Sequence, residues 1–158
     1  MDEDELKRRT KRFALRVIKL VAALPKTAVG RAIGNQLVRA GTSVGSNYRA
    51  SCRARSKAEF IARLGVVEEE ADESEYWMEL IIEGGLMKAK LVEPLKIEAH
   101  ELCAIMTSSR ISAARNEKLA RKATELRKRA IKNQNSKIKN LKCKSLPRFV
   151  SAVPSLPR

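Results

Sequence analysis

The sequence contains few aromatic residues and few helix breakers. Aromatic side chains make up 4% of the 158 residues, and three of the five prolines lie in the last twelve positions. Alanine, leucine, glutamate, lysine and arginine dominate instead, which favours helix over sheet. No run of about 18 uncharged apolar residues is present, so we expect no membrane-spanning segment. The chain opens with the acidic stretch MDEDEL, unlike a secretory signal, and we expect a cytoplasmic protein.

Cysteine and histidine are also scarce. The three cysteines, Cys52, Cys103 and Cys143, are widely spaced, and no CxxC pair occurs. This pattern argues against a disulfide framework or a zinc site and favours reduced, buried thiols. The acids near the single histidine, His100, do not form a recognised set of metal ligands. We therefore expect neither a metal nor a cofactor.

Positive charge is abundant and unevenly distributed. The chain carries 33 Lys and Arg against 18 Asp and Glu, a net charge of +15. Residues 116–158 hold 13 of these cations and only 2 of the acids. Such a segment indicates binding to nucleic acid or another polyanion, although it also occurs as a solvated appendage.

Apolar residues at three- and four-residue spacing predict four helices. The first covers about residues 4–24, and the second about residues 28–53 with Thr27 as its N-cap. The third begins after Ser56 and ends at the pair Gly84-Gly85. The fourth begins near Pro94.

The fourth helix is followed by two basic segments. Residues 116–132 contain strong helix formers and no breaker, so we expect a basic helical extension of the bundle formed by residues 1–115. The composition of residues 133–158 indicates a disordered tail.

The stretch RAGTSVGSNYRASCRARSK, residues 39–57, has two interpretations. Its glycines and hydroxyl residues are those of a phosphate-binding loop, but no strand precedes them and no GK[ST] sequence follows. On a helix, Leu37, Gly41, Val44 and Tyr48 share one face, and small residues there allow a neighbouring backbone to approach. We favour the helix.

Charged residues divide between the second and third helices. The second is basic and the third is strongly acidic, so Arg49 and Arg53 either pair with glutamates of a third helix or remain available to a ligand. The acids Glu69, Asp72 and Glu73 come closest to a catalytic cluster, but nothing evident pairs with them from a second element. We expect no enzyme activity.

The third helix has more apolar surface than one buried stripe requires. A large apolar patch left in water is unusual for a monomer, so the second apolar side predicts a subunit interface, although a wider intramolecular core would also account for it. The residues of this side are Val66, Tyr76, Trp77, Leu80 and Ile81.

Several spaced segments resemble a known family. They are Leu24-Pro25, QLVRAGTSVGSNYRA in the second helix, SKAEF and EADESEYWMELI in the third, and AHELCAIMTSSR in the fourth. Over about residues 10–115 the chain is similar to the four-helix-bundle proteins encoded within 23S rRNA intervening sequences. That family is related to the accessory variability determinant of diversity-generating retroelements.

The resemblance implies an all-α, up-and-down antiparallel four-helix bundle that assembles into a ring-like pentamer. It also implies a basic surface for nucleic acid and, in the retroelement branch, contact with a reverse transcriptase; it carries over no catalytic residue. The positions that match the family, beside Trp77, are expected to be structural: Arg39, Ser43, Asn47 and Glu59.

The leading hypothesis is a non-enzymatic oligomeric scaffold that binds RNA or DNA through backbone contacts. The alternative is a protein-interaction adaptor, such as an accessory subunit of a reverse transcriptase, with the basic tail as its docking arm. Cationic side chains neutralise phosphates and release counterions, which makes such binding depend on salt. The candidate contacts are Arg49, Arg53, Arg55, Lys57, Arg121, Lys122, Arg127, Lys128, Arg129 and Lys132.

Overall fold

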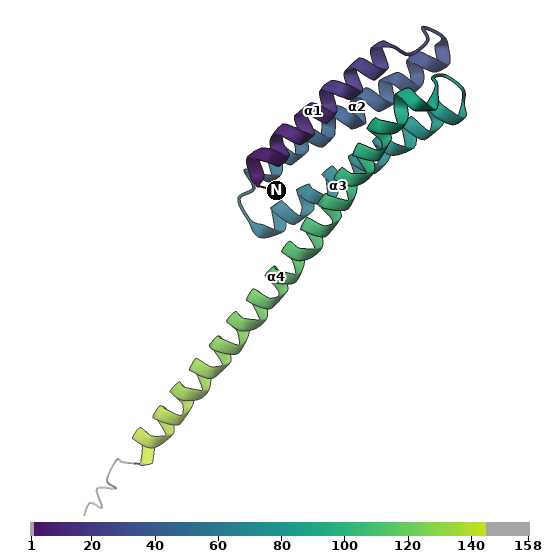
Figure 1. Ribbon diagram of the computed structural model, residues 1–158. Coiled ribbons are helices and arrows are strands. Elements are labelled where there is room, and N and C mark those ends of the chain that lie inside the picture. The colour runs from purple at the N-terminus through teal and green to yellow at the C-terminus, as the bar shows by residue number, and fades with distance from the viewer. Residues whose placement is uncertain (1, 145–158) are drawn as a thin grey trace, which may run out of the picture. The chain divides into compact units, whose positions relative to one another are not determined.

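The computed structural model describes residues 2–144, with side chains described as far as residue 137. It contains four helices, shown in Figure 1, which confirms the all-α prediction. Two compact units divide the chain, residues 1–117 and residues 118–158. The helices are α1 (Glu3–Ala22), α2 (Ala28–Ser51), α3 (Lys57–Glu83) and α4 (Ala89–Lys144).

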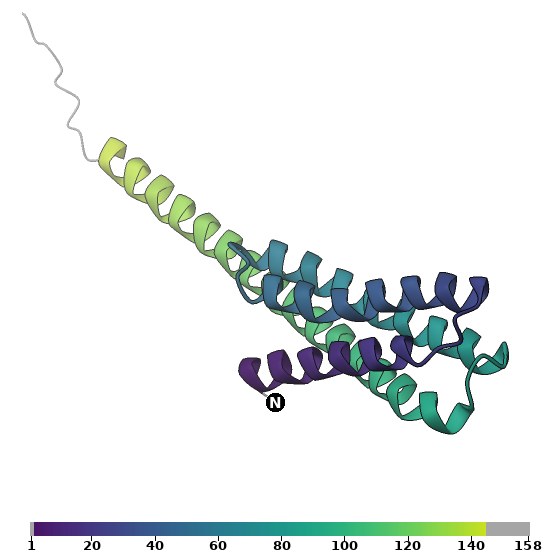
Figure 2. The same ribbon diagram turned by 90° about the horizontal axis from the view of Figure 1, so that it is seen from above.

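The first unit is an up-and-down bundle. Each helix runs antiparallel to the one before it, and short connections join them at alternating ends (Figures 1 and 2). The beginning of α4 lies against both α1 and α3, because Arg9 of α1 contacts Glu98 at 2.8 Å and Arg110 of α4 contacts Glu68 of α3 at 2.6 Å. These contacts close the four-helix arrangement that the sequence predicts.

Side-chain caps fix where the helices begin. The hydroxyl of Thr27 accepts a hydrogen bond from the N–H of Gly30 at 3.0 Å, and the hydroxyl of Ser56 accepts one from Glu59 at 3.1 Å. Each cap satisfies an N–H group that has no partner within its helix. The predicted cap Thr27 is confirmed, and α3 begins after Ser56 as predicted. The first helix begins at Glu3, capped by Asp2, close to the predicted start.

One hydrophobic core runs through the bundle. Every helix contributes side chains that are fully or almost fully buried, spaced as the apolar stripes predict. Representative members are Phe13 and Val17 of α1, Leu37 and Val44 of α2, Leu64 and Met78 of α3, and Leu102 and Met106 of α4.

Glycines of α2 bring it close to α1. A Cβ atom added at Gly41 would lie 2.7 Å from a methyl carbon of Val17, and one added at Gly45 would lie 3.4 Å from the carbonyl oxygen of Thr10. The stretch 39–57 is therefore mostly helical and packed, and the phosphate-loop interpretation is wrong: residues 39–51 belong to α2.

The fourth helix differs from the prediction at both ends. It begins at Ala89 rather than near Pro94, so the proline lies inside its second turn. The helix also continues to Lys144, so residues 133–144, expected to be disordered, are helical. Adding a residue to an existing helix costs far less than nucleating one, and no proline or glycine interrupts this stretch. The remainder of the predicted tail, 145–158, and the side chain of Cys143 lie outside the described residues.

Candidate nucleic-acid interface

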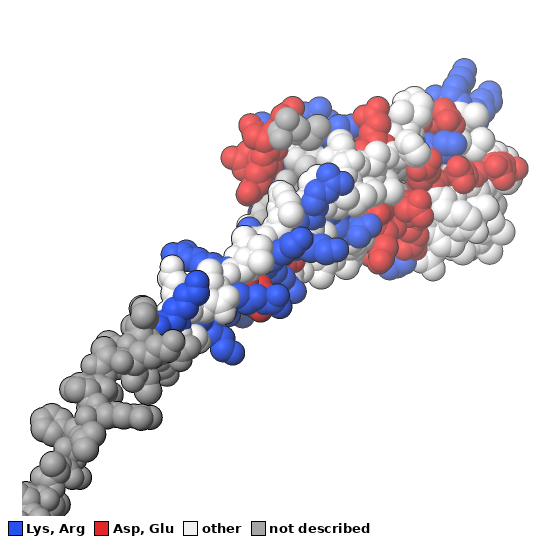
Figure 3. All heavy atoms as spheres, turned by 90° about the horizontal axis from the view of Figure 1, so that it is seen from below, with Lys and Arg blue, Asp and Glu red and all other residues white. Residues whose placement is uncertain are grey.

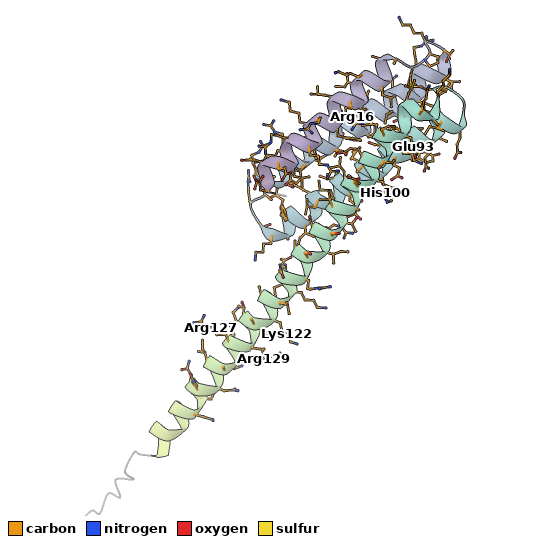
Figure 4. The ribbon with its side chains drawn as sticks, viewed as in Figure 1. Arg16, Glu93, His100, Lys122, Arg127 and Arg129 are labelled. Carbon is orange, nitrogen blue, oxygen red and sulfur yellow. The ribbon has the colours of Figure 1, made fainter. Side chains whose placement is uncertain are left out.

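The part of α4 from residue 118 to residue 137 carries the densest positive charge. It holds eight Lys and Arg against one acid, Glu125, and every side chain in it is exposed. Figure 3 shows blue side chains along this part of the helix. Lys122 and Arg129 lie on one side and Arg127 on another, so the cations surround much of the helix (Figure 4). The candidate contacts within it are Arg121, Lys122, Arg127, Lys128, Arg129 and Lys132.

An apolar seam interrupts this basic surface. Leu119 and Leu126 are seven residues apart on one side of the helix, and their exposed fractions are 59% and 57%. Ile131 is exposed by 50%. Leucines left in water at helical spacing are typical of a surface that another molecule covers.

The other candidate cations gather where α2 ends and α3 begins, a region we call the basic corner, formed by Arg49, Arg53, Arg55 and Lys57. All four residues are exposed. Within the described part of the chain, none of their side chains makes a hydrogen bond or an ion pair. The alternative in which Arg49 and Arg53 pair with glutamates of α3 is thus not met inside this chain.

Acidic residues of α1 lie at the same end of the bundle. The N-terminus of α1 lies beside the connection between α2 and α3 (Figure 1), and Glu3 lines the same hollow as Arg55 and Lys57. Glu3 itself pairs with Lys7. The acids Asp2 to Glu5 therefore offset part of the positive potential of the basic corner.

Glu59 orders the backbone of the basic corner. Its carboxylate accepts a hydrogen bond from the N–H of Arg55 at 2.8 Å and a second from Arg63 at 2.9 Å. These bonds favour the ionised form, so they lower the pKa of the Glu59 carboxyl, the bond from Arg55 contributing most. The structural role predicted for Glu59 is consistent with this geometry.

The ion pairs between helices are formed by residues outside the basic corner. Arg39 of α2 contacts Glu73 of α3 at 2.6 Å, and the indole N–H of Trp77 donates to the same carboxylate at 3.0 Å. Lys96 of α4 lies 3.5 Å from Glu79 of α3. Ser43 and Asn47, the remaining predicted structural positions, are half-buried on α2.

The predicted subunit interface on α3 is partly exposed. Val66 and Tyr76 are exposed by 39% and 52%, and Leu80 and Trp77 are half-buried. Ile81 is fully buried in the core of its own chain and cannot meet a second subunit. The prediction for Ile81 is wrong because Ile81 continues the regular three- and four-residue spacing of the buried residues Ser74 and Met78.

A surface of α1 that is rich in arginine, with Glu5 and Glu98 beside the arginines, was missed. Arg8, Arg12 and Arg16 recur every four residues along α1 and line a hollow of about 300 Å³ together with Arg9. The guanidinium of Arg16 donates to the carbonyl of Pro94 at 3.2 Å. Figure 4 shows Arg16 on α1 and Glu93 on α4. The four-residue spacing of these arginines was a signal in the sequence that could have identified this surface.

Other titratable groups of the bundle, among them Glu70, Cys103 and His100, do not gather into one site. Burial raises the pKa of Glu70 and of Cys103, and one carboxylate oxygen of Glu70 is buried without a hydrogen-bond partner. His100 lies 3.1 Å from Glu75 (the histidine is marked in Figure 4). Among the described residues, no three His, Cys, Asp or Glu side chains gather in a way that would hold a metal ion. Nor does any described helix combine the length and apolarity that a membrane span requires.

Comparisons with known proteins agree with the bundle. Residues 3–108 match the model of the family described as 23S rRNA-intervening sequence protein. The chain also resembles the crystal structure of a protein of unknown function from the S23 ribosomal protein family of Bacteroides thetaiotaomicron, with 31% sequence identity and a TM-score of 0.61. That similarity covers 65% of this chain and 94% of the other. The curated proteins provide no match.

The matched residues begin in α1 and extend into α4, so they include all four helices of the bundle. They end before the basic segment 118–137. The chain therefore belongs to the family of 23S rRNA-intervening sequence proteins, with the sequence after residue 108 outside the family match.

Proposed function

We propose that this protein is a non-enzymatic, oligomeric scaffold of the cytoplasm that binds the phosphate backbone of RNA or DNA with little sequence preference. The observation that carries the proposal is the exposed helical segment 118–137, with eight cations and a single acid. The family name, which refers to 23S rRNA, favours RNA as the partner.

The chemistry of the segment supports backbone contacts rather than base readout. Lysine and arginine neutralise phosphates and release counterions. The segment has no aromatic residue on which a base could stack, and its cations surround much of the helix instead of converging on one groove. The basic corner supplies four further cations from the bundle.

Oligomerisation would multiply this basic surface. The exposed apolar residues of α3, Val66, Tyr76 and Leu80 beside Trp77, support a subunit interface, and five subunits is the number that the family resemblance implies. Several linked copies of a weak site bind one long polyanion more tightly than a single copy does.

A salt titration of RNA binding tests the proposal. The full-length protein is compared with Lys122→Gln/Lys128→Gln and with the matched control Lys11→Gln/Lys26→Gln, which removes the same charge from exposed bundle lysines that have no ion-pair partner among the described residues. We expect a steep fall of the binding constant with salt, and a slope reduced by about 1.4 for the first variant if both lysines contact phosphates of a single strand. A binding constant that does not change with salt, or an equal reduction of the slope in the two variants, would contradict the proposal.

The apolar seam favours the adaptor as a second candidate function. Phosphate binding has no use for Leu119 and Leu126, whereas a protein partner such as a reverse transcriptase would bury them. Co-purification with a reverse transcriptase that survives nuclease treatment and is lost in Leu119→Ser/Leu126→Ser would support this function, and complete loss on nuclease treatment would reject it.

A further inference from the structure

A groove on the bundle combines apolar and cationic side chains. It has a volume of about 790 Å³ and lies between the C-terminal end of α1 and the turn from α3 into α4. Leu20, Leu86 and Leu91 are among its apolar residues, and Leu91 is exposed by 59%. No acid lines it, whereas its cations are Arg16, Lys19, Lys88 and Lys90.

The three lysines of the groove are not neutralised within the chain. Lys19, Lys88 and Lys90 are exposed, and their side chains have no ion-pair partner among the described residues. A partner for this groove should therefore present carboxylates together with apolar side chains. The groove has neither aromatic residues nor an arginine pair free of other contacts, so it suits such a partner better than it suits nucleic-acid bases.

The outer face of α3 has this composition. Five residues at spacings of three and four form one stripe along the helix, which we call the acidic stripe. Tyr76 at its centre is exposed by 52%, and Leu80 is half-buried. The three acids are exposed and have no hydrogen bond or ion pair among the described residues. The stripe consists of Glu69, Asp72, Tyr76, Leu80 and Glu83.

We infer that the acidic stripe of one copy docks into the groove of a second copy. This inference rests on the oligomer of the proposed function and names the two surfaces that join its subunits. Two stripes facing each other across a two-fold axis would place the carboxylates of Glu69, Asp72 and Glu83 near acids of the partner stripe, and like charges repel. Against the groove, the same carboxylates meet Lys19, Lys88 and Lys90 while Tyr76 and Leu80 meet leucines.

The contact is heterologous, because the stripe and the groove are different surfaces of one chain. None of the stripe residues lines the groove, so each subunit can offer both surfaces at once. Repeating such a contact joins subunits head to tail, which gives a closed ring where the rotation between neighbours closes.

Charge exchange tests the inference in the full-length protein. The groove variant is Lys88→Glu/Lys90→Glu and the stripe variant is Glu69→Lys/Asp72→Lys; all four side chains are exposed, so both variants should fold, which circular dichroism checks. Light scattering at one protein concentration should give each variant a mass near that of a single chain, 17.7 kDa. Combining all four changes in one chain should recover the mass of the unmodified protein, since opposite charges again face each other at every contact.

The outcomes separate this inference from the proposed function. A groove variant that keeps the unmodified mass, or a chain with all four changes that fails to recover it, overturns the inference while the oligomer stands. An unmodified protein that is already monomeric overturns both the inference and the proposed oligomer, and RNA binding by that monomer would still support the nucleic-acid part. Loss of assembly in Leu119→Ser/Leu126→Ser, with the groove variant unaffected, would assign the contact to the apolar seam and reject the groove.

Discussion

Gly41 lies where α2 touches the side chain of Val17, a fully buried residue of α1. An added methyl group there would lie 2.7 Å and 2.8 Å from the two methyl carbons of Val17, well inside van der Waals contact. Gly65 on α3 offers the opposite environment, because the nearest atom to an added Cβ is the Cδ of Arg110 at 3.6 Å. An alanine substitution at Gly65 therefore tests helix propensity alone, whereas the same substitution at Gly41 also tests packing between α1 and α2.

We expect Gly41→Ala to lower the free energy of unfolding by about 1–3 kcal/mol, the usual cost of overpacking a core. Gly65→Ala should raise it by up to about 1 kcal/mol, since alanine favours helix over glycine and meets no obstacle. Chemical denaturation of both variants checks the pair. A stabilised Gly41→Ala would show that the two helices separate easily at this point.

At the scale of the element, the start of α3 depends on two reciprocal caps. Ser56 accepts from the N–H of Glu59, and Glu59 accepts from the N–H of Arg55. The pKa of the Glu59 carboxyl is lowered in the folded protein, so its ionised form stabilises the fold. That stabilisation is complete above the unfolded pKa of about 4.3 and is lost as the pH falls through the lower, folded value.

Glu59→Ala should therefore lower the melting temperature at pH 7, and its difference from the unmodified protein should shrink as the pH falls below about 4.3. Glu59→Gln keeps a hydrogen-bonding side chain at this position and should lose less. Thermal melts at several pH values measure both. A difference for Glu59→Ala that is constant down to acid pH would show that the charge of the carboxylate has no part in the cap.

The sequence predicted the elements well where local chemistry decides them. The caps Thr27 and Ser56 and the Gly84-Gly85 end of α3 depend on side chains within a few residues. The start of α4 at Ala89 was missed because proline is favoured at the first helical position, whereas Pro94 lies inside α4. The burial of Ile81 was missed because Ile81 was assigned to the second apolar side of α3, although it continues the spacing of the buried residues Ser74 and Met78.

The charge of the candidate site was predictable from the sequence, but the positions of its side chains relative to other helices were not. The basic segment after residue 116 is visible in the composition. Asp2 to Glu5 lie beside the basic corner because of the way α1 and α2 pack. In the sequence, these acids and the basic corner are separated by about half the length of the bundle. The groove lined by Lys19 and Lys88 likewise joins segments that only the fold brings together.

At the scale of the whole molecule, charge is divided between a nearly balanced bundle and a strongly basic segment. Residues 1–115 hold 20 Lys and Arg against 16 Asp and Glu. Many of these acids are engaged in pairs between helices, such as Arg9 with Glu98 and Arg110 with Glu68. The excess charge available to a polyanion therefore resides mainly after residue 115.

Removing two cations from the basic corner and two from the basic segment of α4 compares what the two surfaces contribute to RNA binding. We expect Arg49→Gln/Arg53→Gln to reduce the salt dependence of RNA binding less than Lys122→Gln/Lys128→Gln does, because Asp2 to Glu5 offset the potential of the basic corner. Binding isotherms across a salt series measure both slopes. Equal slopes for the two variants would mean that the corner contacts phosphates despite its acidic neighbours.

The contact between Gly41 and Val17 also constrains how relatives of this protein can diverge. An ancestor that acquired a methyl group at position 41 would have had to shorten the side chain at position 17, or to move the first helix away from the second. The two positions, 24 residues apart in the chain, should thus mutate as a pair through the history of the lineage. A bulky residue at one should be accompanied by a small residue at the other.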